Sequence, residues 1–225
     1  FNGSPLFTGD SGSGESEIRR WIIENDWLEC IVSLPDQLFF NTGISTYVWI
    51  VTNKKSSQRK GKIQLIDGSS HYKSMKKSLG SKRKEIQDEQ REELIQSYLK
   101  FEESDISKIY SNEFFGYTKV VIEQPLLDDD GEIITDKKGN PKPNTKKRDY
   151  ERVPLEQDID DYYEREVKPH LPNSWMDRNK DKIGYEINFT KYFYKYKPLR
   201  PLENITQDLL KLDEQIGGKM KEILD

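Results

Sequence analysis

The sequence has very few residues of the types that form cross-links and transition-metal sites. It contains one cysteine, Cys30, and two histidines, His71 and His170, in 225 residues. A single cysteine cannot form an internal disulfide, and the isolated histidines lack metal-ligand spacing, so we predict neither a disulfide framework nor a metal site. Cys30 lies in the apolar run LECIVSL and is expected to be a small core residue. This usage is typical of the reducing cytoplasm, the location that we predict.

Long apolar runs and a recognisable signal peptide are also lacking. No stretch approaches the roughly 20 residues of a membrane-spanning helix, so no membrane partner is expected. Hydrophobic residues make up 33% of the chain and charged residues 34%, and we therefore expect some apolar surface to pack against other sequence or a partner. The chain opens at Phe1 without a methionine, which leads us to expect a fragment of a larger protein.

No glycine-rich nucleotide-binding motif is present. The segment SGSGES at residues 11–16 has no strand before it, so it is not a phosphate loop. The acidic segment around Gly131 is expected to be a turn, because Leu126 occupies the first carboxylate position of a calcium loop. The net charge of −4 does not favour nucleic-acid binding by more than one face, and the basic and acidic runs are expected to be solvated. The chain alone shows no complete catalytic constellation.

Residues 16–53 are the most informative segment. A helix beginning at Ser13 or Gly14 has Ile18, Trp21 and Ile22 on one face, which we expect to pack on a flat apolar surface. Apolar, β-branched runs predict strands at 28–34, 46–52 and 61–67, the first covered on both faces. The link between the last two suits a hairpin-like connection. This is the pattern of the later half of an α/β nucleotide-type fold.

The middle of the chain is predicted to mix helix and strand. We expect helix over 69–101, with short-face residues Tyr72, Met75 and Leu79 and a stronger helix from 85. In that stronger helix Leu94, Ile95, Tyr98 and Leu99 share one side. Further predictions are a strand at 114–123, an exposed hairpin or flexible excursion after it, a helix at 156–167 and an extended segment at 184–196.

The last segment has apolar residues at alternating three- and four-residue spacing. They are Leu202, Ile205, Leu209, Leu212 and Ile216, continued by Met220 and Ile223. This spacing is an a/d seam, although Gly217 and Gly218 weaken its middle. One interpretation is a terminal helix that docks on its own domain. The other, which we favour, is a helix that binds a partner helix.

One loop is a candidate for chemistry. Phe39 and Phe40 are adjacent between two predicted strands, followed by Asn41, Thr42 and Gly43. In a purely structural interpretation one ring fills the core and Gly43 makes the turn. In a functional interpretation one ring projects into a cleft, where it would stack against a flat base with about 1–3 kcal/mol.

At these residues the sequence resembles a known family. The segment ESEIRRWIIENDWLECIVSLPDQLFFNTGISTYVWIVTNKK resembles the modification (methyltransferase) subunit of type I restriction–modification systems. KGKIQLIDGSS, KSLGSKRKEI and GYEINFTKYFYKYKPLRPLENI extend the resemblance over nearly the whole chain. It implies the C-terminal part of an enzyme that transfers a methyl group from S-adenosylmethionine to the exocyclic amino group of adenine in DNA.

The resemblance also implies which parts are present. The family's cofactor-binding motif and its Asn-Pro-Pro-aromatic catalytic motif do not occur here, so no cofactor site and no catalytic residue are expected in this chain. Residues 1–68 would be the C-terminal part of a Rossmann-like methyltransferase sheet. Residues 69–200 would be a mostly helical region with a small β excursion, and 201–225 a partner-binding helix.

The resemblance gives the two candidate sites their roles. Phe40, with Phe39 as the alternate and Asn41 beside them, would stack on the flipped target base, because a base inside a duplex is unreachable. The seam would bind the DNA-specificity subunit, and restriction subunits would join the full complex. The fragment alone is expected to be inactive. The alternative is a non-catalytic assembly module.

Overall fold

The computed structural model describes residues 1–196 and 198–215 of the 225. Its contacts divide the chain into two compact units, one from Phe1 to Phe193 and one that begins at Tyr194. The first unit contains two larger sheets and a two-stranded hairpin.

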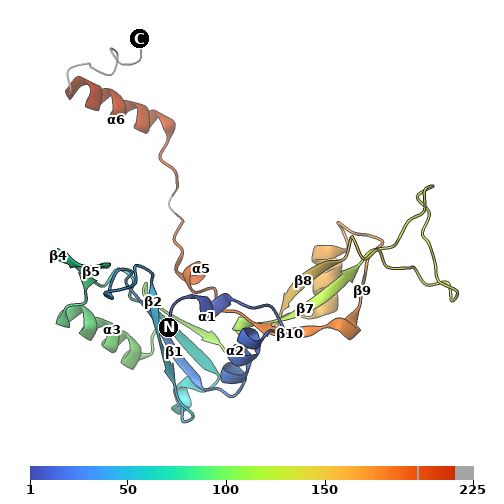
Figure 1. Ribbon diagram of the computed structural model, residues 1–225, viewed down its shortest axis with the longest axis horizontal. Helices are drawn as coiled ribbons and strands as arrows, with labels where there is room; N and C mark the ends of the chain where they lie inside the picture. Colours follow the sequence, from blue (N-terminus) through green and yellow to red (C-terminus); the bar gives the residue numbers. More distant parts are fainter. Residues whose placement is uncertain (197, 216–225) are drawn as a thin grey trace. The chain divides into compact units, whose positions relative to one another are not determined.

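A four-stranded mixed sheet forms the centre of the first unit (Figure 1). Its strand order is β2-β1-β3-β6, with bounds β1 Leu28–Leu34, β2 Thr46–Val51, β3 Lys62–Asp67 and β6 Ser107–Ser111. β1 and β3 are parallel, and β2 and β6 pair antiparallel at the edges. The three predicted strands and the α/β class are therefore confirmed.

Helices cover both faces of this sheet. Alternate residues of β1 enter different cores, since side chains in a strand alternate between faces. Ile31 packs in the core that contains Ile23 of α2 (Gly14–Glu24). Cys30 and Val32 pack in the core that contains Leu94 of α3 (Asp88–Lys100). Cys30 is fully buried, as predicted, and burial raises the pKa of its thiol.

The start of α2 is as predicted, but its buried face is not. Ser13 caps the helix by accepting a hydrogen bond from the amide of Ser16 at 3.3 Å. Ile18 and Trp21 are 59% and 57% exposed, while Arg19 is buried. The Arg19 guanidinium can be buried because it donates to three backbone carbonyls, those of Tyr185 (2.6 Å), Pro5 (3.0 Å) and Gly9 (3.2 Å).

The expectation of helix over 69–86 is wrong. These residues form a hairpin of β4 (Lys73–Leu79) and β5 (Lys82–Glu85), which turns at Gly80 with a φ of +58°. The predicted apolar face has no core to pack on, and Leu79 is 53% exposed. The helix from 85 is confirmed as α3, but Ile95 and Leu99 are exposed and only Leu94 is fully buried.

The link between β2 and β3 is not a hairpin. Both strands pair with β1, one on each side, so the chain crosses over β1 by way of η1 (Ser57–Arg59). The sequence pattern marks the strands but not their neighbours, because two adjacent apolar strands fit either arrangement.

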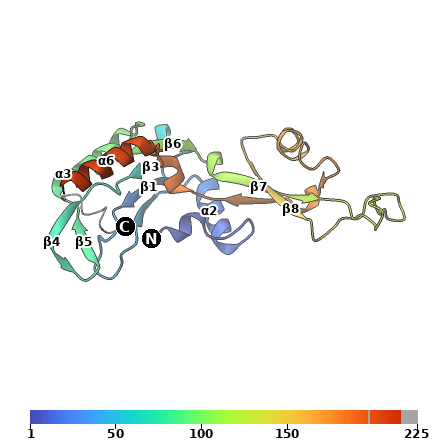
Figure 2. The same cartoon turned by 90° about the horizontal axis from the view of Figure 1, so that it is seen from above.

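A second antiparallel sheet builds an arm (Figures 1 and 2). Its order is β10-β7-β8, with β9 also pairing to β7; the bounds are β7 Gly116–Glu123, β8 Asp149–Pro154, β9 Trp175–Met176 and β10 Lys182–Tyr185. One face packs under α4 (Ile159–Tyr162) and the π-helical turn η3 (Tyr163–Val167). The predicted strand at 114–123 and helix at 156–167 are confirmed.

Residues 124–148 leave the arm as an exposed excursion of tight turns, as predicted (Figure 1). Three isolated β-bridges connect it, Pro125 with Pro143, Leu127 with Ile133, and Thr135 with Pro141.

Two further expectations for this region need correction. The segment 184–196 is not extended throughout, because α5 (Phe189–Phe193) follows β10 and buries Phe189. Residues 69–200 are not mostly helical; they hold seven strands, β4 to β10, and α3 is their one long helix among the described residues. Short elements complete the unit: α1 (Ser4–Phe7), η2 (Glu113–Phe115) and η4 (Arg178–Lys180).

The second unit contains α6 (Leu202–Gln215). The predicted division into 1–68, 69–200 and 201–225 stays a prediction, and it does not coincide with the compact units, because β6 pairs with β3 across residue 68. No described helix has the length and apolarity needed to cross a membrane.

Candidate nucleic-acid interface

The loop with the two phenylalanines joins β1 to β2, directly after the carboxyl end of β1. Phe39 is 47% exposed and Phe40 60% exposed, and Asn41 is also exposed. A β-bridge between Phe39 and Thr42 tightens the loop. Neither ring fills the core, contrary to the expectation of the structural interpretation.

The β4–β5 hairpin holds this loop in place. The amide of Ser81 donates to the carbonyl of Phe40 at 3.0 Å, and the amide of Arg83 donates to the carbonyl of Gln37 at 2.9 Å. Lys84 forms an ion pair with Asp36. This hydrogen-bonded carboxylate raises the pKa of the Lys84 ammonium, which also lies 3.9 Å from the centre of the Tyr72 ring. The two aromatic side chains are thus presented by a braced loop.

Gly80 is a position that sequence analysis missed. A Cβ atom there would lie 3.1 Å from the carbonyl oxygen of Phe40 and 3.2 Å from its ring. The left-handed backbone at this turn also favours glycine. Glycine between the two basic runs KSMKK and SKRK was the available sign of a hairpin turn.

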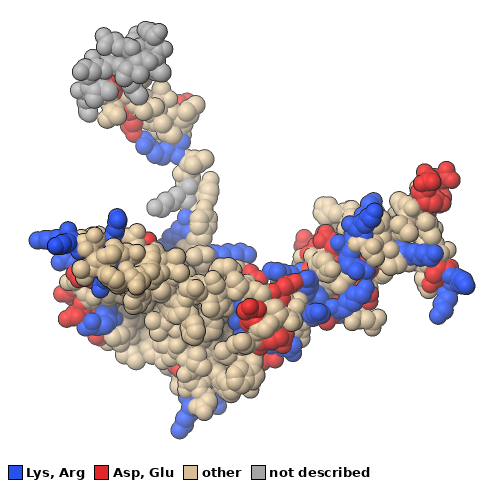
Figure 3. All heavy atoms as spheres, in the orientation of Figure 1, with Lys and Arg blue, Asp and Glu red and all other residues tan. Residues whose placement is uncertain are grey.

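The hairpin supplies positive charge beside the rings. Six cations lie on it: Lys73, Lys76, Lys77, Lys82, Arg83 and Lys84. Figure 3 shows Lys and Arg side chains on the surface of β4 and β5. Exposed aromatic rings next to lysine and arginine are the combination that binds single-stranded or flipped nucleotides, since the rings stack on bases and the cations attract phosphates.

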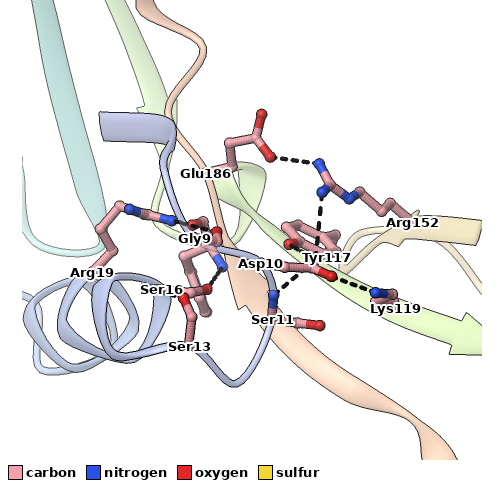
Figure 4. Close-up of polar contacts among 11 residues, drawn as sticks. Gly9, Asp10, Ser11, Ser13, Ser16, Arg19, Tyr117, Lys119, Arg152 and Glu186 are labelled. Carbon is pink, nitrogen blue, oxygen red and sulfur yellow. Dashed lines mark hydrogen bonds and ion pairs between the residues drawn. The ribbon is translucent and has the colours of Figure 1, made fainter. Parts of the chain in front are cut away.

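A second polar cluster ties the loop at residues 9–13 to the arm (Figure 4). Asp10 forms an ion pair with Lys119, contacts Arg152 at 3.4 Å and accepts from the Tyr117 hydroxyl at 3.3 Å. Burial would raise the pKa of Asp10, but the hydrogen bonds from Lys119 and the Ser11 amide leave it below its ordinary value. Neither Asp10 nor Lys119 was singled out from the sequence.

The predicted partner-binding residues lie on α6. Leu202, Ile205, Leu209 and Leu212 are all exposed, by 78%, 39%, 48% and 53%. Ile216 lies outside the described residues, as do Met220 and Ile223. The helix is confirmed, and the described apolar residues of the seam are available to a partner.

Within residues 1–196 and 198–215 no group of His, Cys, Asp and Glu side chains is arranged to hold a metal ion. His71 is buried and lies 3.4 Å from Glu93, while His170 is exposed.

Comparison with known proteins gives one consistent family. A family model described as N-6 DNA Methylase matches residues 3–143. The chain is 33% identical over 110 residues to the type I restriction enzyme MjaIX methylase subunit of Methanocaldococcus jannaschii, which is 49% of this chain and 19% of that protein. It is 46% identical over 55 residues to the HindI methylase subunit of Haemophilus influenzae, which is 24% of this chain and 12% of that protein. These matches span less than a fifth of the relatives' length.

A solved structure is also similar. It is the type I restriction–modification methyltransferase subunit from Streptococcus thermophilus, at 24% identity and a TM-score of 0.43, covering 50% of this chain and 22% of that one.

Proposed function

The chain belongs to the N-6 DNA methylase family, and we propose that it is part of a type I restriction–modification methyltransferase subunit that methylates adenine in DNA. The complete enzyme would transfer the methyl group of S-adenosylmethionine to the exocyclic amino group. The similarity of this chain to type I methylase subunits supports this assignment.

The braced Phe39–Phe40 loop is the observation that carries the proposal. Two rings that are about half exposed or more, on a loop fixed by a basic hairpin, form a platform for an extruded base. Stacking on such a platform contributes about 1–3 kcal/mol per base. Phe40 is the first candidate, because its carbonyl is bonded to the hairpin, and Phe39 and Asn41 lie beside it.

We infer that the ends of the two parallel strands β1 and β3 offer no room for the methyl donor. Gly68 follows the parallel strand β3, the position where a glycine could admit a cofactor. A Cβ there would lie 2.6 Å from the carbonyl oxygen of Ser33 and 3.1 Å from Leu94, so the chain itself fills that space. Pro35 follows the parallel strand β1 directly. We therefore infer no contact with S-adenosylmethionine at Gly68 or Pro35.

The edge of β2 supports the proposal that more of the catalytic sheet joins here. Tyr47 exchanges two backbone hydrogen bonds with Phe1, and residues two apart point the same way, so the backbone groups of Trp49 also face outward. Val48 and Val51 are 45% and 49% exposed. An apolar strand at a sheet edge is the pattern of a strand that is buried in the complete sheet.

Helix α6 supports a role in assembly. We infer that the seam on α6 binds helices of the DNA-specificity subunit, with restriction subunits joining the full complex. A purely non-catalytic assembly module is the second candidate function, and the exposed leucines of α6 favour it. In either case the cytoplasm is the proposed location.

Phe40→Ala in the full-length subunit, assembled with its specificity subunit, separates the two candidates. Loss of one stacking contact of 1–3 kcal/mol corresponds to about a 5- to 150-fold lower kcat/KM for methyl transfer. Phe7→Ala is the matched control, because Phe7 is 52% exposed and lies in α1 rather than in the loop. Normal assembly with reduced methylation supports base stacking. Lost assembly, or unchanged methylation, contradicts it. The isolated chain is expected to show no methyl transfer.

A further inference from the structure

A cleft of about 460 Å³ lies on the arm, between the loop at residues 9–13 and one face of the second sheet. Charged and polar side chains form most of its lining, together with one valine and one tyrosine. The lining residues are Asp10, Ser11, Lys119, Val121, Arg148, Tyr150, Asn179, Lys180 and Lys182.

The strand register explains why the cations gather here. Lys182 on β10 is opposite Lys119 on β7, and Lys119 is opposite Arg152 on β8. Residues directly opposite in a sheet share a face, so these three cations form one row across three strands. Val121 and Tyr150 form the next row on the same face. Lys and Arg side chains are visible along this arm in Figure 3.

A second group of cations lies further along the arm. Arg148 and Lys180 both contact one carboxylate oxygen of Glu123, at 2.7 and 3.1 Å. Glu123 is 2% exposed, so it compensates these cations from beneath the cleft. Lys180 also pairs with Asp177 at 2.8 Å.

Two side chains in the cleft, those of Lys182 and Ser11, are available to bind an anion. Lys182 has no ion-pair partner among residues 1–196 and 198–215, and its stem lies against the loop, 3.4 Å from where a Cβ on Gly12 would be. Ser11 is 8% exposed, and its hydroxyl is buried without a hydrogen-bond partner in the described structure. A buried hydroxyl left unbonded is unfavourable, and an oxyanion in the cleft would satisfy it.

We propose that this cleft binds the phosphate backbone of DNA, as a contact separate from the Phe39–Phe40 loop. The inference rests on the proposed function, which makes DNA the substrate. The cations follow one face of β7 from Lys119 to Glu123, four residues or roughly 14 Å of strand, and a chain of phosphates can run along that length. Tyr150, 48% exposed between them, can contact the sugar or base.

Lys182 is the residue to test. Replacing Arg148 or Lys180 would leave the buried Glu123 less well compensated and would confuse binding with stability. Lys182→Gln removes a charge without breaking an ion pair in the described structure, and Lys182→Arg retains the charge. Lys168→Gln is the matched control, because Lys168 follows η3, which covers the opposite face of the arm.

The assay is fluorescence-anisotropy binding of the 225-residue chain to a labelled DNA duplex over a range of salt concentrations. The logarithm of the association constant falls as the logarithm of the salt concentration rises. Loss of one phosphate contact makes this negative slope less steep by about 0.9. We expect the less steep slope for Lys182→Gln. We expect the wild-type slope for both Lys182→Arg and Lys168→Gln. Ser11→Ala is expected to weaken binding about fivefold.

Three results would overturn the proposal. They are an unchanged slope for Lys182→Gln, an equal change for Lys168→Gln, and displacement of the duplex from this site by inorganic phosphate at stoichiometric concentration, which would indicate a single-anion site. The outcome is independent of the base-stacking test. If Phe40→Ala leaves methylation unchanged while Lys182→Gln makes the slope less steep, the stacking role fails and the cleft stands.

Discussion

Gly80→Ala tests whether the basic hairpin holds the phenylalanine loop. Gly80 has a φ of +58°, and a Cβ there would lie 3.1 Å from the carbonyl oxygen of Phe40 and 3.2 Å from its ring. Alanine therefore introduces two separate perturbations. The backbone must keep a left-handed conformation, and Phe40 must move by a few tenths of an ångström.

A second glycine separates these perturbations. Gly61 has a φ of +68°, and nothing lies within 4 Å of its Cβ position, so Gly61→Ala tests the backbone effect alone. That effect is about 1–2 kcal/mol in each variant. In Gly80→Ala the displaced Phe40 also strains the 3.0 Å hydrogen bond from the Ser81 amide, and loss of such a bond is worth about 1 kcal/mol.

Amide hydrogen exchange is the direct measurement. The backbone effect and the lost hydrogen bond together amount to about 2–3 kcal/mol next to Ser81, which corresponds to about 30- to 150-fold less protection in Gly80→Ala than in the wild type, with Ser81 unchanged in Gly61→Ala. Methyl transfer by the assembled enzyme should fall only in Gly80→Ala. If Ser81 and Arg83 exchange equally fast in both variants, the hairpin does not brace the loop, and the two rings are not held in a preorganised platform.

Two further predictions concern the arm and helix α6. Because the folded-state pKa of Asp10 is lowered, its contribution to stability is complete above the ordinary carboxyl pKa and is lost as the pH falls through the lower folded value. Asp10→Asn should flatten the fall in unfolding midpoint between about pH 5 and about pH 2, and identical profiles for variant and wild type would refute this contribution. Leu209→Asp with Leu212→Asp should abolish co-purification of the full-length subunit with its specificity subunit, with Lys211→Asp as the control on the same helix. Retained co-purification of the double variant would show that the seam is not the contact.

The elements predicted correctly are those whose burial is visible in a short stretch of sequence. β1 reads as an apolar run because helices cover both of its faces, and Ser13 caps α2 by a local hydrogen bond. The errors depend on contacts between residues far apart. Tyr72, Met75 and Leu79 have helical spacing, yet the segment is a hairpin, because the turn at Gly80 and the hydrogen bonds to Gln37 and Phe40 decide its structure. The exposure of Phe39 and Phe40 was open for the same reason.

The exposed apolar face of α2 is a candidate contact surface. The periodicity of Ile18, Trp21 and Ile22 indicates a face that packs on an apolar surface, and in the first unit Arg19 occupies the buried side instead. Ile18 and Ile22 line an apolar hollow of about 540 Å³ together with Trp49 and Val51 of the edge strand β2. A second hollow of about 310 Å³ flanks β2 on the other face, lined by Val48, Ile50 and Leu94 among others. Strand β2 is apolar on both faces, its outer backbone groups point away from β1, and an exposed helix face lies beside it. These are the surroundings of a central strand in an α/β sheet. The helix face that the sequence predicts to pack on an apolar surface therefore lines the same apolar hollow as the edge strand β2.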